Sequence, residues 1–283
     1  MTETALAYAD RALALIREAN KSLFVVTNAR MYADLFKKGG NLYMAAHKFK
    51  EAGDAYVSAA RNFIRVNDQD QATLNYINAS RAYENEYPGE AVQCLTPVID
   101  HYVVWGEFAK AAKYQEQQAV LNDRLGDTAG ALRCWETAAG FFEIVRNDVA
   151  SFRCRARTAE HYALVRDYEK ADGLFQSLEK SVLASEIGYH DVPTYVFNAT
   201  LCQFLWLPCE VVESIFKTRI VDQYAPLFSV KNRMVDTIIT AVKANDPGRI
   251  SSFMSKYTEV GKVTEWQATM LGRIRDLFTG VEE

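Results

Sequence analysis

Residues 49–63, Phe-Lys-Glu-Ala-Gly-Asp-Ala-Tyr-Val-Ser-Ala-Ala-Arg-Asn-Phe, contain the pattern that decides the fold. Small residues and aromatic rings recur at helical spacing along this stretch, through Ala52, Tyr56, Ala59 and Phe63. Small residues allow neighbouring helices to approach closely, and aromatic rings fill the space between them. The stretch therefore predicts an amphipathic helix that packs tightly against similar helices.

The start of this helix is repeated three more times along the chain. Four segments have alanine at their fourth position: Phe49–Ala52, Pro88–Ala91, Thr128–Ala131 and Tyr168–Ala171. These alanines are 39, 40 and 40 residues apart, and a second series between them, Ala72 and Ala112, is again 40 residues apart. Two helices in each period of about 40 residues are typical of a tetratricopeptide-like solenoid. We therefore predict an all-α protein whose solenoid presents one long concave face to a partner.

The repeat fades after about residue 185, where glycine and proline interrupt the chain irregularly. We expect a tetratricopeptide-like helical-hairpin solenoid over residues 1–190 and a C-terminal helical bundle over residues 191–283. The uncharged run 192–209 approaches the length of a membrane-spanning helix. Its prolines and polar residues would be costly in lipid, so the run favours a buried helix of a bundle.

The composition indicates a cytosolic scaffold and argues against other classes. Hydrophobic residues make up 49% of the 283 residues, charged residues 24%, and the formal net charge is −4. This balance argues against bulk attraction to nucleic acid. Five cysteines form an odd set without a CxxC pair, so we expect reduced thiols rather than disulfides or a zinc site. The N-terminus has no secretory signal pattern.

No catalytic constellation is recognisable in the sequence. It lacks the GxxxxGK[ST] phosphate loop, the GxGxxG fingerprint, the HExxH zinc motif and the GxSxG elbow. The four histidines lie far apart and have no metal-ligand spacing. We therefore predict no enzyme activity, no cofactor, no metal and no catalytic residue. An enzyme would need a pocket of clustered His, Cys and carboxylate groups in the C-terminal bundle.

Several motifs together resemble, in order and spacing, the alpha class of the soluble attachment proteins of membrane fusion. The matching segments are Ala52–Tyr56, Pro88–Leu95, Gly106–Lys113, Tyr168–Ala171, Tyr195–Phe204 and Trp266–Ile274. The resemblance implies a non-catalytic adaptor that surrounds a SNARE four-helix bundle in several copies and recruits an NSF-type hexameric AAA ATPase for disassembly. It also implies a cytoplasmic protein, peripheral on membranes and monomeric when free. A generic tetratricopeptide-like scaffold for another helical or peptide partner is the alternative.

The resemblance also implies which residues contact the SNARE bundle. The basic positions of the family correspond to Lys113, Arg153 and Arg157. On a helix, Arg153 and Arg157 share one face, whereas Arg155 points away from it. Two guanidinium groups one turn apart suit acidic side chains on a coiled-coil surface. The alternative is that these are ordinary solvated cations.

Two further contacts are implied by the resemblance. An apolar loop for weak membrane contact corresponds to Leu23, Phe24, Val25 and Val26, unless this run continues the first helix into the core. Acidic residues that contact the ATPase correspond to Asp246, Glu282 and Glu283, unless these are ordinary solvated carboxylates. The chain departs from the family at Lys243, which stands where the family has acidic residues, and it lacks the family's penultimate leucine.

Overall fold

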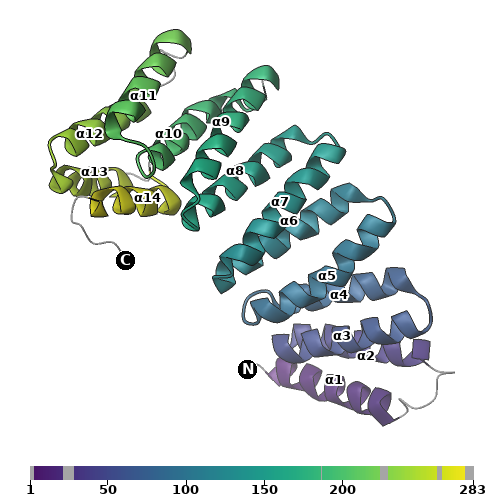
Figure 1. Ribbon diagram of the computed structural model, residues 1–283. Coiled ribbons are helices and arrows are strands. Elements are labelled where there is room, and N and C mark those ends of the chain that lie inside the picture. Colours follow the sequence, from purple (N-terminus) through teal and green to yellow (C-terminus); the bar gives the residue numbers. More distant parts are fainter. Residues whose placement is uncertain (1–2, 22–28, 186, 224–228, 260–262, 278–283) are drawn as a thin grey trace. The chain divides into compact units, whose positions relative to one another are not determined.

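The computed structural model describes residues 3–21, 29–185, 187–223, 229–259 and 263–277. These residues form fourteen α-helices and one short 3-10 turn, with no strand among them (Figure 1). The prediction of an all-α fold is therefore confirmed. The chain divides into two compact units, Met1–Asn147 and Asp148–Glu283. The change from solenoid to bundle near residue 190 stays a prediction, because compactness does not define where a repeat ends.

The first unit is a row of helices, each of which packs mainly against the helix before it and the helix after it (Figure 1). Its helices are α1 (Glu3–Lys21), α2 (Ala29–Ala45), α3 (Phe49–Arg65), α4 (Gln69–Tyr83), α5 (Pro88–Val104), α6 (Phe108–Leu125) and α7 (Thr128–Ile144). Contact between sequence neighbours is the arrangement that a helical-hairpin repeat produces.

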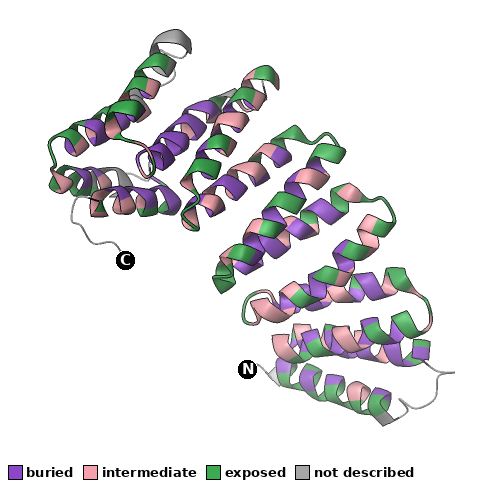
Figure 2. Cartoon of the chain, in the orientation of Figure 1, coloured by how far each residue is buried: buried purple, intermediate pink, exposed green. Residues whose placement is uncertain are grey.

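The repeated small residues form the core of this unit. The repeat alanines are almost completely buried, namely Ala52, Ala72, Ala91, Ala112 and Ala131. Figure 2 shows buried residues along the sides of the helices that face their neighbours. Gly53 lies so close to the Tyr83 ring that a Cβ at this position would be 2.3 Å from ring atom Cε1. The small residues are therefore required by close helix packing, as the sequence pattern predicts.

Short turns with local caps separate these helices. The Asp68 side chain accepts a hydrogen bond from the Gln71 backbone N–H at the start of α4, and Asp127 accepts one from Gly130 at the start of α7. Gly126 ends α6 with φ of 75°, a left-handed conformation that costs glycine little. These caps satisfy backbone groups that helix ends leave without an intrahelical partner.

The second unit contains the remaining elements: α8 (Asp148–Leu164), α9 (Tyr168–Ser185), the 3-10 turn η2 (Tyr189–Asp191), α10 (Val192–Gln203), α11 (Cys209–Gln223), α12 (Ser229–Lys243), α13 (Pro247–Glu259) and α14 (Glu265–Asp276). Helix α10 is buried at nearly every position, which confirms the prediction of a buried helix within the uncharged run. Within the described ranges, no helix has both the length and the apolar character needed to cross a bilayer.

The last helix, α14, returns to the first helices of this unit. The Trp266 indole N–H donates to the Glu160 carbonyl oxygen at 2.9 Å, and its ring lies 5.7 Å from the Phe175 ring. The Arg273 guanidinium donates to the carbonyl oxygens of Ala163 and Leu164, at the C-terminal end of α8. The terminal tryptophan motif therefore closes the core of the second unit.

Candidate functional site

A basic surface in the first unit includes one of the predicted residues. Lys113 is exposed on α6, and within the described ranges no carboxylate pairs with it. Lys110 lies one turn earlier, 3.3 Å from Glu107 and 5.4 Å from the centre of the Tyr102 ring. The side chain at Lys113 is therefore available to an acidic partner without breaking an internal ion pair.

Two further cations that no sequence motif indicated lie near this surface, Arg81 on α4 and Lys110 on α6. Burial raises the pKa of Tyr114, the neighbouring Tyr102 raises it further, and Arg81 and Lys110 both oppose the rise. Both cations are thus close enough to act on one hydroxyl of α6. Their positions on separate helices explain why local sequence patterns did not associate them.

Arg153 and Arg157 lie on α8 in the second unit. Arg153 is exposed. Arg157 has its Nη1 atom 2.7 Å from a carboxylate oxygen of Glu160 on the same helix. Arg155 is turned toward α9, where it donates to the Ser177 hydroxyl at 2.9 Å. A partner that binds Arg157 must therefore compete with Glu160, whereas Lys113 has no such competitor.

The acidic positions differ in how much the structure says of them. Asp246 lies at the start of α13, where its Oδ1 accepts from the backbone N–H groups of Gly248 and Arg249. Its Oδ2 is 3.0 Å from Nε of Arg249. This carboxylate therefore caps the helix, and its negative charge interacts favourably with the positive N-terminal end of the helix dipole. Glu282 and Glu283 lie outside the described residues.

Lys243, the position with the opposite sign to the family pattern, forms an ion pair with Glu213 of α11. Lys217 lies 2.7 Å from the same carboxyl group. Hydrogen bonds from Lys217 and Lys243 lower the pKa of Glu213 to about 2. Lys243 thus has a local acidic partner that joins α12 to α11.

The predicted membrane loop, Leu23, Phe24, Val25 and Val26, lies outside the described residues. The contact of this apolar run with lipid stays a prediction.

The described side chains offer little reactive chemistry. No three His, Cys, Asp or Glu side chains within the described ranges come together as a metal site would require. Four of the cysteines are buried, and Cys209 is half-buried. Burial raises the pKa of Cys94 to about 12, which leaves this thiol protonated and weakly nucleophilic at neutral pH.

Comparisons with known proteins agree with the motif pattern. The sequence profile of the family described as "Soluble NSF attachment protein, SNAP" matches residues 2–279. Alpha-soluble NSF attachment protein of Homo sapiens is 23% identical over 88% of this chain and 85% of its own length. Vesicular-fusion protein SEC17 of Komagataella phaffii is 24% identical over 86% of this chain and 83% of its own.

A solved structure supports the fold alone. A signal-transduction ATPase with a tetratricopeptide repeat sensor, from Pyrococcus horikoshii, has a TM-score of 0.53 at 13% identity, over 97% of this chain and 44% of that chain. The resemblance inferred from the motifs is confirmed by the family profile, which covers nearly the whole sequence. The chain therefore belongs to the soluble NSF attachment protein family.

Proposed function

We propose that this chain is an adaptor that binds assembled SNARE bundles and brings them to an NSF-type AAA ATPase for disassembly. The family match over residues 2–279 is the observation that carries this proposal. Relatives are named as NSF attachment proteins and as vesicular-fusion proteins, which places the family's work at vesicle fusion. The ATPase is expected to hydrolyse ATP to unwind the bundle, and this chain is expected to catalyse no reaction itself.

The SNARE contact is proposed to lie at Lys113, Arg153 and Arg157. Exposed cations attract the acidic side chains of a helical bundle, and this attraction weakens as salt screens it. Because Arg157 is already paired with Glu160, part of its attraction to a partner is offset by the loss of that pair. Lys113 should therefore contribute more per charge than Arg157.

The remaining contacts complete the proposal. Asp246 is proposed to contact the ATPase, although its carboxylate is already partly occupied by its contacts with the start of α13. Glu282 and Glu283 would add negative charge to the same contact. Leu23, Phe24, Val25 and Val26 are proposed to give weak, reversible attachment to a bilayer surface. The free protein is proposed to be a cytoplasmic monomer that assembles only around its partner.

A binding experiment tests the SNARE contact. The protein is incubated with assembled SNARE bundle and with the separate SNARE helices, as wild type, as Lys113→Glu and as Arg153→Glu/Arg157→Glu. We expect salt-sensitive preference for the bundle, weakened by both variants, and wild-type binding by the control Arg133→Glu, an exposed residue of α7. No binding to either form, in protein that melts cooperatively, would favour a scaffold for a different partner.

A further inference from the structure

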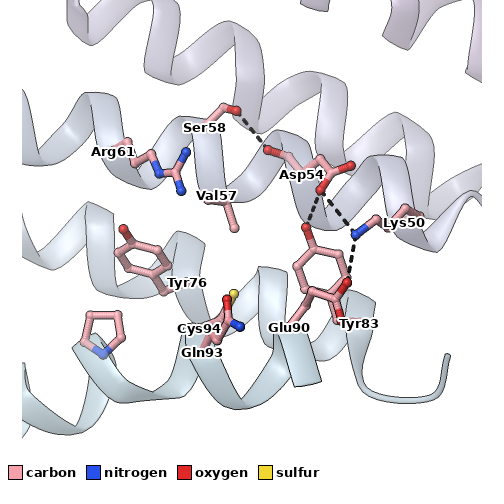
Figure 3. A pocket seen from close by; sticks show the side chains of 11 residues that line it. Lys50, Asp54, Val57, Ser58, Arg61, Tyr76, Tyr83, Glu90, Gln93 and Cys94 are labelled. Atoms are coloured by element: carbon pink, nitrogen blue, oxygen red, sulfur yellow. Dashed lines mark hydrogen bonds and ion pairs between the residues drawn. The ribbon is translucent and has the colours of Figure 1, made fainter. Parts of the chain in front are cut away.

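The first unit contains a hollow of about 480 Å³ between α3, α4 and α5, separate from the proposed SNARE contacts (Figure 3). The polar side chains that matter for its chemistry are Lys50, Asp54, Arg61, Tyr76, Tyr83 and Glu90. Its volume lies within the range of sites that hold small molecules or a few side chains of a partner.

One end of the hollow has excess negative charge. Lys50 Nζ lies 3.1 Å from Glu90 Oε1 and 3.9 Å from Asp54 Oδ1, so one cation serves two carboxylates. The Tyr83 hydroxyl donates to Asp54 at 2.6 Å. The hydrogen bond from Lys50 lowers the pKa of Glu90, which keeps this carboxyl group ionised at neutral pH. These three charges sum to minus one.

The other end carries a single cation. Arg61 is exposed and lies seven residues after Asp54 on α3, a separation of about 10 Å along the helix axis. Its guanidinium lies beside Tyr76, where it opposes the rise in pKa that burial causes in that hydroxyl. Within the part of the chain that the structure describes, no carboxylate pairs with Arg61. Figure 3 shows Arg61 and Lys50 at opposite ends, with Val57 between them on α3.

The α5 wall adds a backbone acceptor. Pro97 lies inside α5 and has no N–H, so the Gln93 carbonyl oxygen lacks its usual donor four residues on. Gln93 and Pro97 both line the hollow.

We propose that this hollow binds a helical polypeptide segment of a partner protein, one that carries a carboxylate for Arg61 and, two turns away, a cation for Asp54 and Glu90. Two turns of helix span about 10 Å and return the side chain to the same face, which matches the separation of the two ends. A phosphate would meet Arg61 but be repelled by the carboxylates at the other end. The proposal goes beyond the SNARE adaptor role, whose basic residues lie on α6 and α8.

The test uses fluorescently labelled alanine-based helical peptides of about 15 residues and the full-length protein. Their fourth and eleventh positions hold glutamate and lysine, two glutamates, two lysines, or two glutamines. By fluorescence anisotropy at low salt, we expect the glutamate–lysine peptide to bind about fivefold more tightly than the others, and we expect this preference to vanish at about 1 M salt. A glutamate–lysine peptide that binds no better than the glutamine peptide would overturn the proposal.

Arg61→Glu makes the test specific to the hollow. This variant should prefer the two-lysine peptide, because both ends are then negative, whereas Arg65→Glu, one turn further along α3 and outside the lining, should keep the wild-type preference. Arg61→Gln provides a second test with a smaller change of charge. In this variant the advantage of the glutamate–lysine peptide over the two-lysine peptide should disappear, because the end at position 61 is then neutral. Equal effects of Arg61→Glu and Arg65→Glu would contradict the proposal. Loss of SNARE binding by Arg61→Glu without any peptide preference would also contradict it, and would assign Arg61 to the SNARE surface.

Discussion

The two units of this chain are stabilised in different ways. In the first unit, each helix packs mainly against its neighbours in sequence, and alanine and tyrosine side chains fill the spaces between them. In the second unit, α14 bonds back to α8, as with Trp266 to Glu160 and Arg273 to Ala163, across 106 and 110 residues of sequence.

This difference predicts which single substitutions should change stability most. Stability in a row of helices is a sum of many neighbour contacts, so the loss of one is shared along the row. A unit closed by its terminal helix depends strongly on the long-range contacts of that one helix, because residues of α8, α9 and α10 share a core cluster with it. We therefore expect the second unit to be more sensitive to changes in α14 than the first is to changes in any one of its helices.

The largest effect is expected from Trp266→Ala. Removing this side chain leaves a cavity beside Phe175 and loses the hydrogen bond to the Glu160 carbonyl, at a cost of about 3–5 kcal/mol of unfolding free energy. Urea denaturation should show the second unit unfolding in an early, separate transition. The control is Trp206→Ala, because the Trp206 side chain is 40% exposed. If Trp266→Ala lowers the unfolding free energy no more than Trp206→Ala does, the idea that α14 closes the core of the second unit is contradicted.

A half-buried lysine, Lys231, should make the stability of the second unit depend on pH. Lys231 Nζ donates to the Thr194 hydroxyl at 2.6 Å, and burial lowers the pKa of Lys231 to about 8. Between about pH 8 and the usual lysine pKa, the unfolded state therefore binds more protons than the folded state. The free energy of unfolding then rises with pH through that window. Its destabilising effect is fully present below about pH 8.

Lys231→Met removes this pH effect. The variant should be more stable than wild type by about 1–3 kcal/mol near pH 7, and this advantage should shrink at about pH 10, where wild-type Lys231 is neutral. Comparing urea midpoints of the two proteins at both pH values cancels the contribution of other titrating groups. The interpretation fails if the difference between the two proteins is the same at both pH values.

An intermediate effect is expected from Gly53→Ala in the first unit. The added Cβ would lie 2.3 Å from the Tyr83 ring, so the ring must move, at a cost of about 1–3 kcal/mol. Gly89→Ala is the matched control, because a Cβ there meets no atom within 4 Å. Thermal melts of the two variants should separate clearly, and a loss smaller than that of Trp266→Ala would agree with shared stability in this unit.

The smallest effects are expected at two helix caps, one in each unit. Thr264→Ala removes the capping box at the start of α14, and Asp68→Ala removes the cap of α4, each at about 1 kcal/mol. Because α14 closes its unit, Thr264→Ala should also speed local exchange of the α14 and α8 amides. Hydrogen exchange checks this, with Thr264→Ser as a control that keeps the cap. Fast exchange in α14 alone, with α8 unchanged, would argue against the idea that α14 closes the core of the second unit.

Much of the fold follows from local sequence patterns, but the surfaces do not. The alanine period predicted residues that are almost completely buried, and the uncharged run predicted the buried α10, because both patterns depend only on helical spacing. Arg273 contacts residues of α8 that lie more than 100 positions earlier in the sequence, so no local sequence pattern could predict these contacts. The hollow with Arg61 needs three helices to form, and the association of Arg81 with Lys110 depends on how α4 packs relative to α6. The role of Asp246 as a cap, in contrast, is readable from the Asp-Pro-Gly run that starts α13.

Disassembly of a SNARE bundle by an NSF-type ATPase tests the adaptor role most directly. Bundle carrying a fluorescence pair is mixed with the ATPase and ATP, and loss of energy transfer is followed as this protein is added. We expect disassembly only when the protein is present, with a rate at least about tenfold lower for Lys113→Glu/Arg153→Glu and unchanged for Arg133→Glu. No acceleration by well-folded wild-type protein, or equal loss in the Arg133→Glu control, would contradict the proposed function.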